Sequence, residues 1–71
     1  MYAWIKAEDD AVPVSGPYWI VPDPKEASNM SEANAREIWK RASLDFREYD
    51  WEMVPCSTGI GFLLQGLRKN S

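Results

Sequence analysis

Few side chains in this sequence are suited to catalysis or to metal binding. The 71 residues include a single cysteine, Cys56, and no histidine, so the commonest general base and the commonest metal ligand are both missing. A catalytic thiol needs a neighbouring base or cation that favours the thiolate, and no histidine can serve Cys56 in this way. Cysteine and histidine ligands for a structural zinc ion are likewise too few. We therefore expect a protein that is not an enzyme and that needs no cofactor or metal.

The segment 55–61 has the composition of a loop that could bind a ligand. Its small and hydroxyl-bearing residues could direct backbone amides toward an anion, and the candidate ligand-binding residues are Ser57, Thr58 and Gly59. The segment lacks the lysine of a nucleotide-binding P-loop, and Phe62 stands where a phosphatase-type loop needs an arginine. We interpret the segment as a hairpin turn, with a small ligand or anion site as the alternative.

The acidic run Glu8-Asp9-Asp10 offers oxygen ligands of the kind that divalent cations prefer. Its spacing does not match that of a calcium-binding loop. Charges at the end of a strand also discourage pairing with another chain, and we interpret the run as a solvated strand end.

The elements that must position these residues form two predicted hairpins around a helix. Four segments have the composition or the alternation of strands: 2–8, 18–21, 49–53 and 60–67. Two prolines predict a loop at 11–17, and glycines predict that the last strand is weakened or bulged at Gly61 and Gly66. We predict an α+β fold, with a four-stranded antiparallel sheet in ββαββ order and one main helix on one face. It forms a single domain over 1–71, with a frayed tail at 68–71.

Two helix starts lie between the second and third predicted strands. Asp23 followed by Pro24 has the pattern of an N-cap and a first helical residue. Ser31 offers a second N-cap ahead of an apolar periodic segment. We predict a single helical turn at 24–28 and the main helix at 31–46.

The main helix is amphipathic. One face carries apolar residues at helical spacing and is predicted to be buried: Ala35, Ile38, Trp39, Ala42 and Phe46. The other side carries three bases: Arg36, Lys40 and Arg47. A basic stripe of this kind is most often a solvated helix face, and contact with phosphate or with an acidic partner is the functional alternative.

Aromatic residues dominate the prediction of function. The chain contains four tryptophans, three tyrosines and two phenylalanines, and three of the four predicted strands are apolar on both sides. A helix of about 16 residues is ~24 Å long and can cover only one face of the sheet. The second face is therefore either covered by another chain or left as an apolar patch that marks a binding site. The alternative is that the segments 9–17 and 22–30 fold over it.

Charge and composition limit the partners. The formal net charge is −3, from 8 basic and 11 acidic residues, which disfavours nucleic acid and anionic membrane as partners. No segment approaches the ~20 apolar residues of a membrane span, residues 1–10 do not have the pattern of a signal peptide, and a lone thiol fits a reducing compartment. We expect a cytoplasmic protein.

We predict a small non-enzymatic protein-binding module that acts as a stoichiometric inhibitor or adaptor, with homodimerisation as part of that binding. Its size and acidity are typical of the inhibitors that phages and other mobile elements direct against host or defence proteins. The predicted partner-binding residues are Trp4, Tyr18, Trp19, Arg36, Lys40 and Arg47. Two alternatives stay open: a small-ligand or nucleotide-binding module that uses the loop 56–61, and a single-stranded RNA binder.

Overall fold

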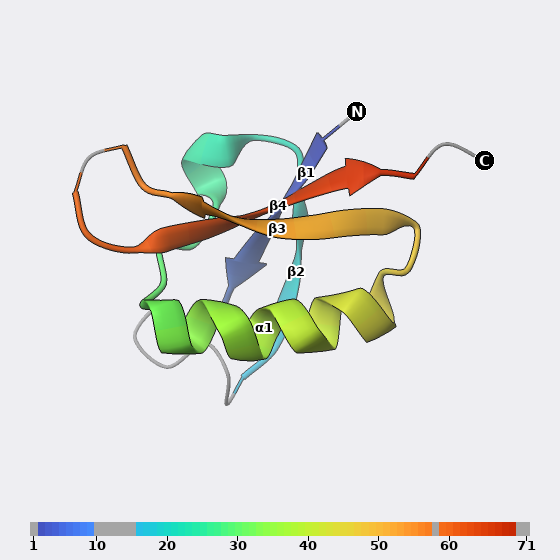
Figure 1. The fold of residues 1–71 in the computed structure, drawn as a ribbon, viewed down its shortest axis with the longest axis horizontal. Coiled ribbons are helices and arrows are strands. Elements are labelled where there is room, and N and C mark those ends of the chain that lie inside the picture. The colour runs from blue at the N-terminus through green and yellow to red at the C-terminus, as the bar shows by residue number, and fades with distance from the viewer. Residues whose placement is uncertain (1, 10–15, 58, 70–71) are drawn as a thin grey trace.

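The computed structural model describes residues 2–9, 16–57 and 59–69 and confirms the predicted α+β fold (Figure 1). Its elements are β1 (Tyr2–Ala7), β2 (Tyr18–Val21), the 3-10 turn η2 (Pro24–Glu26), α1 (Glu32–Asp45), β3 (Tyr49–Pro55) and β4 (Phe62–Arg68). All strand pairs are antiparallel, and the order across the sheet is β2-β1-β4-β3. The two hairpins therefore meet at β1 and β4, and the outer edges of the sheet are β2 and β3.

The two hairpins diverge from each other, and Figure 1 shows β1 and β2 inclined steeply to β3 and β4. β1 pairs with β4 through its first three residues. Beyond them Ser28 takes the place of β4, because its N–H donates to the Ile5 carbonyl (2.9 Å) and its Oγ accepts from the Ala7 N–H (2.8 Å). Met30 exchanges two backbone hydrogen bonds with Phe62 (2.9 and 2.7 Å). The segment 28–30 thus fills the wedge between the hairpins and leads into α1.

Both predicted helix starts are confirmed. The Asp23 carboxylate accepts from the Lys25 N–H (2.9 Å) at the start of η2, and Ser31 Oγ accepts from the Asn34 N–H (3.3 Å) at the start of α1. These bonds satisfy amide groups that a first helical turn leaves without partners. α1 ends at Asp45, so the predicted bounds were one residue too long at each end.

The core lies between α1 and one face of the sheet. Ile5, Ile38 and Leu64 are fully buried there, and the predicted buried stripe of the helix is confirmed at Ala35, Ile38 and Ala42, with Phe46 packed against the same cluster. Trp39 differs from the prediction, because its side chain is 41% exposed. It lies at the margin of the stripe, where its indole N–H reaches an acceptor that the apolar core would not provide.

The last strand also differs from the prediction. It begins at Phe62, because Gly61 has a φ of +116° that a strand residue does not adopt. The pairing of β3 with β4 is continuous through Gly66, opposite Trp51, so there is no bulge at that position. β4 includes Arg68, and the Lys69 N–H donates to the Glu48 carbonyl (2.7 Å), so residues 68 and 69 of the predicted frayed tail are bonded to the sheet; residues 70 and 71 lie outside the described residues. Most of the predicted loop 11–17, and residue 10 of the acidic run, lie outside the described residues.

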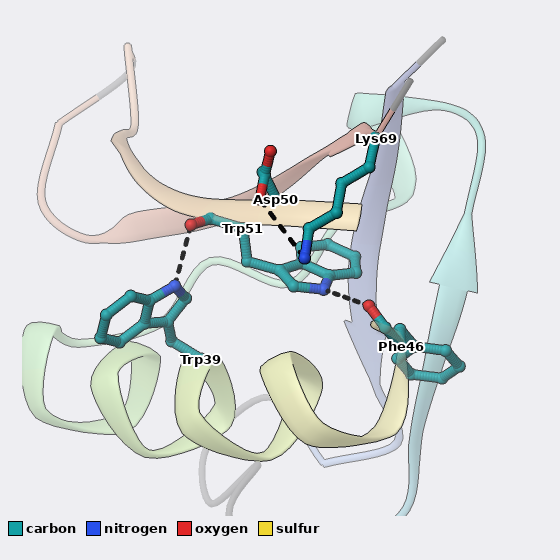
Figure 2. A network of polar contacts seen from close by, with 5 residues as sticks. All are labelled: Trp39, Phe46, Asp50, Trp51 and Lys69. Atoms are coloured by element: carbon teal, nitrogen blue, oxygen red, sulfur yellow. Dashed lines mark hydrogen bonds and ion pairs between the residues drawn. The ribbon is translucent and has the colours of Figure 1, made fainter. Parts of the chain in front are cut away.

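The indole of Trp51 packs directly against the backbone of Gly66. A Cβ atom at Gly66 would stand 2.6 Å from Trp51 Cζ3, closer than any non-bonded contact allows. The indole is fixed from its other side, because Trp51 Nε1 donates to the Phe46 carbonyl (3.2 Å; Figure 2). A glycine is therefore required here for close approach of a ring to the backbone.

Candidate protein-binding site

The side of the sheet that faces away from α1, which we call the open face, collects several of the predicted binding residues. The strand register places Lys6 opposite Trp19 and Trp4 opposite Val21. Residues opposite each other in adjacent strands share a face. Tyr2 is likewise opposite Leu67. The open face thus combines side chains from β1, β2 and β4.

Apolar side chains on the open face are accessible. The exposed fractions are 53% for Tyr2, 43% for Trp19 and 45% for Leu67, whereas Trp4 is half-buried and Val21 is buried. A single helix does leave large apolar side chains of the described sheet in contact with solvent. Large exposed apolar side chains gathered on one face are typical of interaction surfaces.

The segment 22–30, which we considered as a cover for the second face of the sheet, lies against part of that face. η2 contacts β1, and Pro24 and Ala27 line one wall of a shallow groove whose other side includes Leu63 of β4. This segment therefore shelters the end of the open face near Leu63. It leaves Tyr2, Trp19 and Leu67 exposed.

Acidic residues form one margin of the open face. β3 contributes Asp50 opposite Leu67 and Glu52 opposite Gln65, and both acids are exposed. Lys69 Nζ lies 3.7 Å from the Asp50 carboxylate. β3 thus places two acids on the open face, where β1 contributes Lys6 and β4 contributes Gln65. The apolar surface is therefore bordered by negative charge along β3.

Tyr18 lies on the opposite side of the sheet from Trp19, its neighbour in sequence. Its ring packs edge-on against Phe46 with 5.8 Å between centroids, its hydroxyl donates to the Asp45 carboxylate, and the Arg41 guanidinium lies 4.7 Å above the ring. Burial of the phenol, together with the hydrogen bond and the charge of Asp45, raises the pKa of Tyr18 well above its usual range. Tyr18 thus fastens the edge strand β2 to the end of α1, away from Trp4 and Trp19.

Replacing Tyr18 with phenylalanine should lower the free energy of unfolding by about 1 kcal/mol, since the ring contacts stay and the hydrogen bond to Asp45 is lost. The raised pKa favours the protonated phenol in the folded state. This contribution is complete below the pKa of the unfolded tyrosine, about 10, and is lost as pH rises above it. Unfolding in urea between pH 8 and 11 should show a steeper alkaline loss for the wild type than for Tyr18→Phe. Equal slopes would contradict the assignment, with Tyr2→Phe as the control at an exposed tyrosine.

Two of the three predicted basic residues line a groove between α1 and β3. Arg36 and Lys40 stand beside Trp39 on its helical wall, and the groove has a volume of about 340 Å³. Arg36 lies 2.8 Å from the Glu32 carboxylate and Lys40 lies 3.9 Å from that of Glu37. Their positive charge is therefore partly compensated by neighbours on the same helix.

The third basic residue, Arg47, follows the C-cap of α1 and lies beyond the helix. Arg47 is therefore not part of the helical surface that carries Arg36 and Lys40. The six predicted partner-binding residues divide among separate places: Trp4 and Trp19 on the open face, Arg36 and Lys40 at the groove, Tyr18 against the helix end, and Arg47 after it.

The β3–β4 connection is a hairpin turn, as predicted. The Cys56 N–H donates to the Gly61 carbonyl (3.0 Å) and the Gly59 N–H to the Cys56 carbonyl (3.4 Å), so both amides are used within the turn and neither is directed at a ligand. Ser57 is exposed, and Thr58 lies outside the described residues. Asn29 Nδ2 donates to the Ile60 carbonyl (3.1 Å) and anchors the turn to the segment before α1.

Sequence reasoning did not select Tyr2, Leu67 or Trp39 as binding residues. A signal existed for Tyr2, which shares the alternation of Trp4 along the same strand. Leu67 needed the register with β1, which the sequence does not supply. Trp39 was assigned to the core because its spacing matches the buried stripe.

The described part of the chain has no three acidic or cysteine side chains grouped as a metal site. Among the helices of the same residues, none is long and apolar enough to cross a membrane. Comparison with known proteins gives no match: no family model fits the chain, and no curated protein or solved structure matches it. The class of protein must therefore be argued from the surface itself.

Proposed function

We propose that this chain is a protein-binding module that docks on its partner through the open face. The observation that carries the proposal is the joint exposure of Tyr2, Trp19 and Leu67 on the side of the sheet away from α1. Tyrosine and tryptophan concentrate binding energy in protein interfaces because each buries a large, rigid surface at a low cost in conformational entropy.

A protein fits this face better than RNA does. Single-stranded RNA binds where aromatic rings lie beside a basic groove that follows the phosphates. Here Lys6 beside Trp19 is a single base of the open-face strands, and the acids Asp50 and Glu52 of β3, the first paired with Lys69, border the face and would repel the phosphates. A partner with an apolar centre and basic residues at one margin would match both the rings and the acids.

The mode of action that we favour is stoichiometric binding, as an inhibitor or an adaptor. A target among host or defence proteins stays a prediction, and so does the cytoplasmic location. Homodimerisation through the open face is a special case of the proposal. Light scattering that reports a monomer at about 1 mM would exclude that case and leave the docking of another protein in place.

The test compares variants in capture of the partner from the native host. Trp19→Ala combined with Tyr2→Ala should weaken retention of the partner about tenfold or more, because buried aromatic anchors are typical hot spots. Trp4→Ala is less informative, since Trp4 is half-buried and also supports the fold. Leu44→Ala is the matched control, because Leu44 is 68% exposed on α1 and away from the open face. Unchanged retention by the folded double variant would contradict the proposal.

A further inference from the structure

The outer edge of β3 presents backbone groups that could pair with another strand. In an antiparallel pair, successive residues direct their N–H and C=O groups alternately toward and away from the partner strand. Two hydrogen bonds identify the outward residues: the Trp51 carbonyl accepts from Trp39 Nε1 (2.8 Å), and the Tyr49 N–H donates to the Phe46 carbonyl (3.3 Å). Met53 follows Trp51 by two residues and has the same orientation. The N–H of Trp51 and both backbone groups of Met53 therefore point out along this edge.

The groove described above runs beside this edge on the helix side of the sheet. Trp51, Glu52 and Met53 line it from β3, and Arg36, Trp39 and Lys40 line it from α1. On the open-face side of the same edge stand the exposed acids Asp50 and Glu52. A strand added to β3 would thus have on one side a groove with the apolar walls of Trp39, Trp51 and Met53, where Arg36 and Lys40 are paired with acids of their own helix. On its other side it would have two carboxylates.

We propose that the β3 edge binds an extended segment of a partner protein as a fifth strand, and that this segment alternates basic and aliphatic residues. Side chains of a strand alternate between its two sides. Lysine or arginine would then lie opposite Glu52 and opposite Asp50, where it would share the carboxylate with Lys69. Valine, isoleucine or leucine would enter the groove beside Trp39. Main-chain hydrogen bonds supply the affinity in this mode of recognition, and the alternating side chains supply the specificity. The site goes beyond the proposed function, because it does not use Tyr2, Trp19 or Leu67.

A second copy of this chain is disfavoured at the same edge in the register centred on Trp51. Two-fold antiparallel pairing centred on Trp51 would place Asp50 of each copy opposite Glu52 of the other. Like charges directly opposite each other destabilise a strand pair. In this register the acids thus act against self-association, and they favour a basic strand.

Trp39 occupies one of the backbone acceptors of the β3 edge. Its indole N–H already occupies the Trp51 carbonyl (Figure 2), which is an acceptor that an incoming strand also needs. The partner must displace this N–H, so removal of the indole donor should favour binding. Strand addition therefore predicts that removal of the Trp39 donor raises the affinity for the partner. A variant that only damaged a binding surface would lower it.

The first test is a titration of the ¹⁵N-labelled protein with an acetylated and amidated heptapeptide of alternating lysine and valine. The amide signals of Trp51 and Met53 should shift, and their exchange with solvent should slow. Glu52→Lys should weaken binding about fivefold or more through loss of a cross-strand charge pair. Trp39→Phe should strengthen it severalfold, and Trp19→Ala should leave it unchanged. That last variant separates this site from the open face.

Two control peptides make the test decisive. The same heptapeptide with N-methylated valines cannot form the strand ladder, and a glutamate–valine heptapeptide would meet Asp50 and Glu52 with like charge. Both should bind at least about tenfold more weakly than the lysine–valine peptide. Equal binding by the N-methylated peptide, binding insensitive to Glu52→Lys, or no binding at millimolar concentration would each overturn the proposal.

The charge argument makes a second, independent prediction. In Glu52→Lys, two-fold pairing of β3 places Asp50 of each copy opposite the new lysine of the other, so this variant should dimerise under conditions where the wild type stays monomeric. Glu48→Lys is the matched control, because it changes the net charge equally at an exposed residue just before β3. Sedimentation velocity should show a dimer for Glu52→Lys alone. A monomer for that variant, or dimers for both, would contradict the register on which the proposal rests.

Discussion

Gly66→Ala should lower the free energy of unfolding by about 2 kcal/mol, the effect expected of overpacking in a close-packed core. The added methyl group would lie 2.6, 2.7 and 2.9 Å from three carbon atoms of the Trp51 ring. Moving the Trp51 ring away from this methyl group would itself cost free energy. Its N–H is bonded to the Phe46 carbonyl, and its faces and edges meet Phe46 and Tyr49 at centroid distances of 6.4 and 5.4 Å. A domain of this length has only roughly 4–10 kcal/mol of stability in total, so the loss is a large share of it.

Urea unfolding followed by tryptophan fluorescence measures this effect. Gly16→Ala is the control, because no atom lies within 4 Å of a Cβ built at Gly16. The clash explanation also predicts strong coupling. In the background of Trp51→Leu, which removes the ring, Gly66→Ala should cost much less than in the wild type. Equal costs in the two backgrounds would mean that contact with the indole is not the reason for a glycine at this position.

Ser28→Ala should also destabilise the fold strongly, with a loss of about 2 kcal/mol. Ser28 is 1% exposed, and its hydroxyl accepts the Ala7 N–H at 2.8 Å, at the point where β4 no longer runs beside β1. Alanine would leave that amide buried without an acceptor. The cost of an unsatisfied buried donor exceeds the net value of the hydrogen bond, because water no longer compensates it.

Hydrogen exchange distinguishes this local effect from a general loss of stability. The Ala7 amide should exchange faster in Ser28→Ala under native conditions, by a larger factor than amides of β3 and β4. Ser43→Ala serves as the control, because Ser43 is exposed on α1 and alanine favours a helix. Full protection of the Ala7 amide in Ser28→Ala would show that another group accepts it and would contradict the assignment of Ser28 as its partner.

Much of the fold could be predicted because local signals agree with each other. Asp23 and Ser31 are side chains that prefer N-caps, and both cap helices in the structure. The strand at Tyr18–Val21 has the predicted bounds. The first strand ends one residue earlier than predicted, and the third runs two residues further, to Pro55. A proline is tolerated there because β3 is an edge strand, and Pro55 needs no outward N–H for the ladder.

The candidate site could be predicted only in outline. The alternation of Trp4 and Trp19 within apolar strands indicated a second face that one helix would not cover. Tyr18 also belonged to an apolar alternation, but its hydroxyl found an acceptor in Asp45, 27 residues further along the chain. A pattern along one strand states which residues share a face and does not state which face the helix covers.

Trp39 illustrates the same limit on the helix. Its spacing relative to Ala35 and Ile38 is that of a buried residue, and the periodicity holds for those two. The position of β3 decides the rest. The Trp51 carbonyl at the sheet edge offers an acceptor at 2.8 Å, and the indole lies across the edge, half in the groove and half in solvent. Helical periodicity contains no information on where the sheet ends.

By itself, the sequence determined the order and type of the elements, the helix starts and the excess of apolar surface over what one helix can cover. These properties follow from near neighbours: caps within three residues, alternation within a strand and periodicity within a helix. The tertiary structure decided the strand order β2-β1-β4-β3, and with it which strands are edges and which rings are exposed. Strand order depends on contacts between residues far apart in the chain, and local sequence patterns do not predict such contacts.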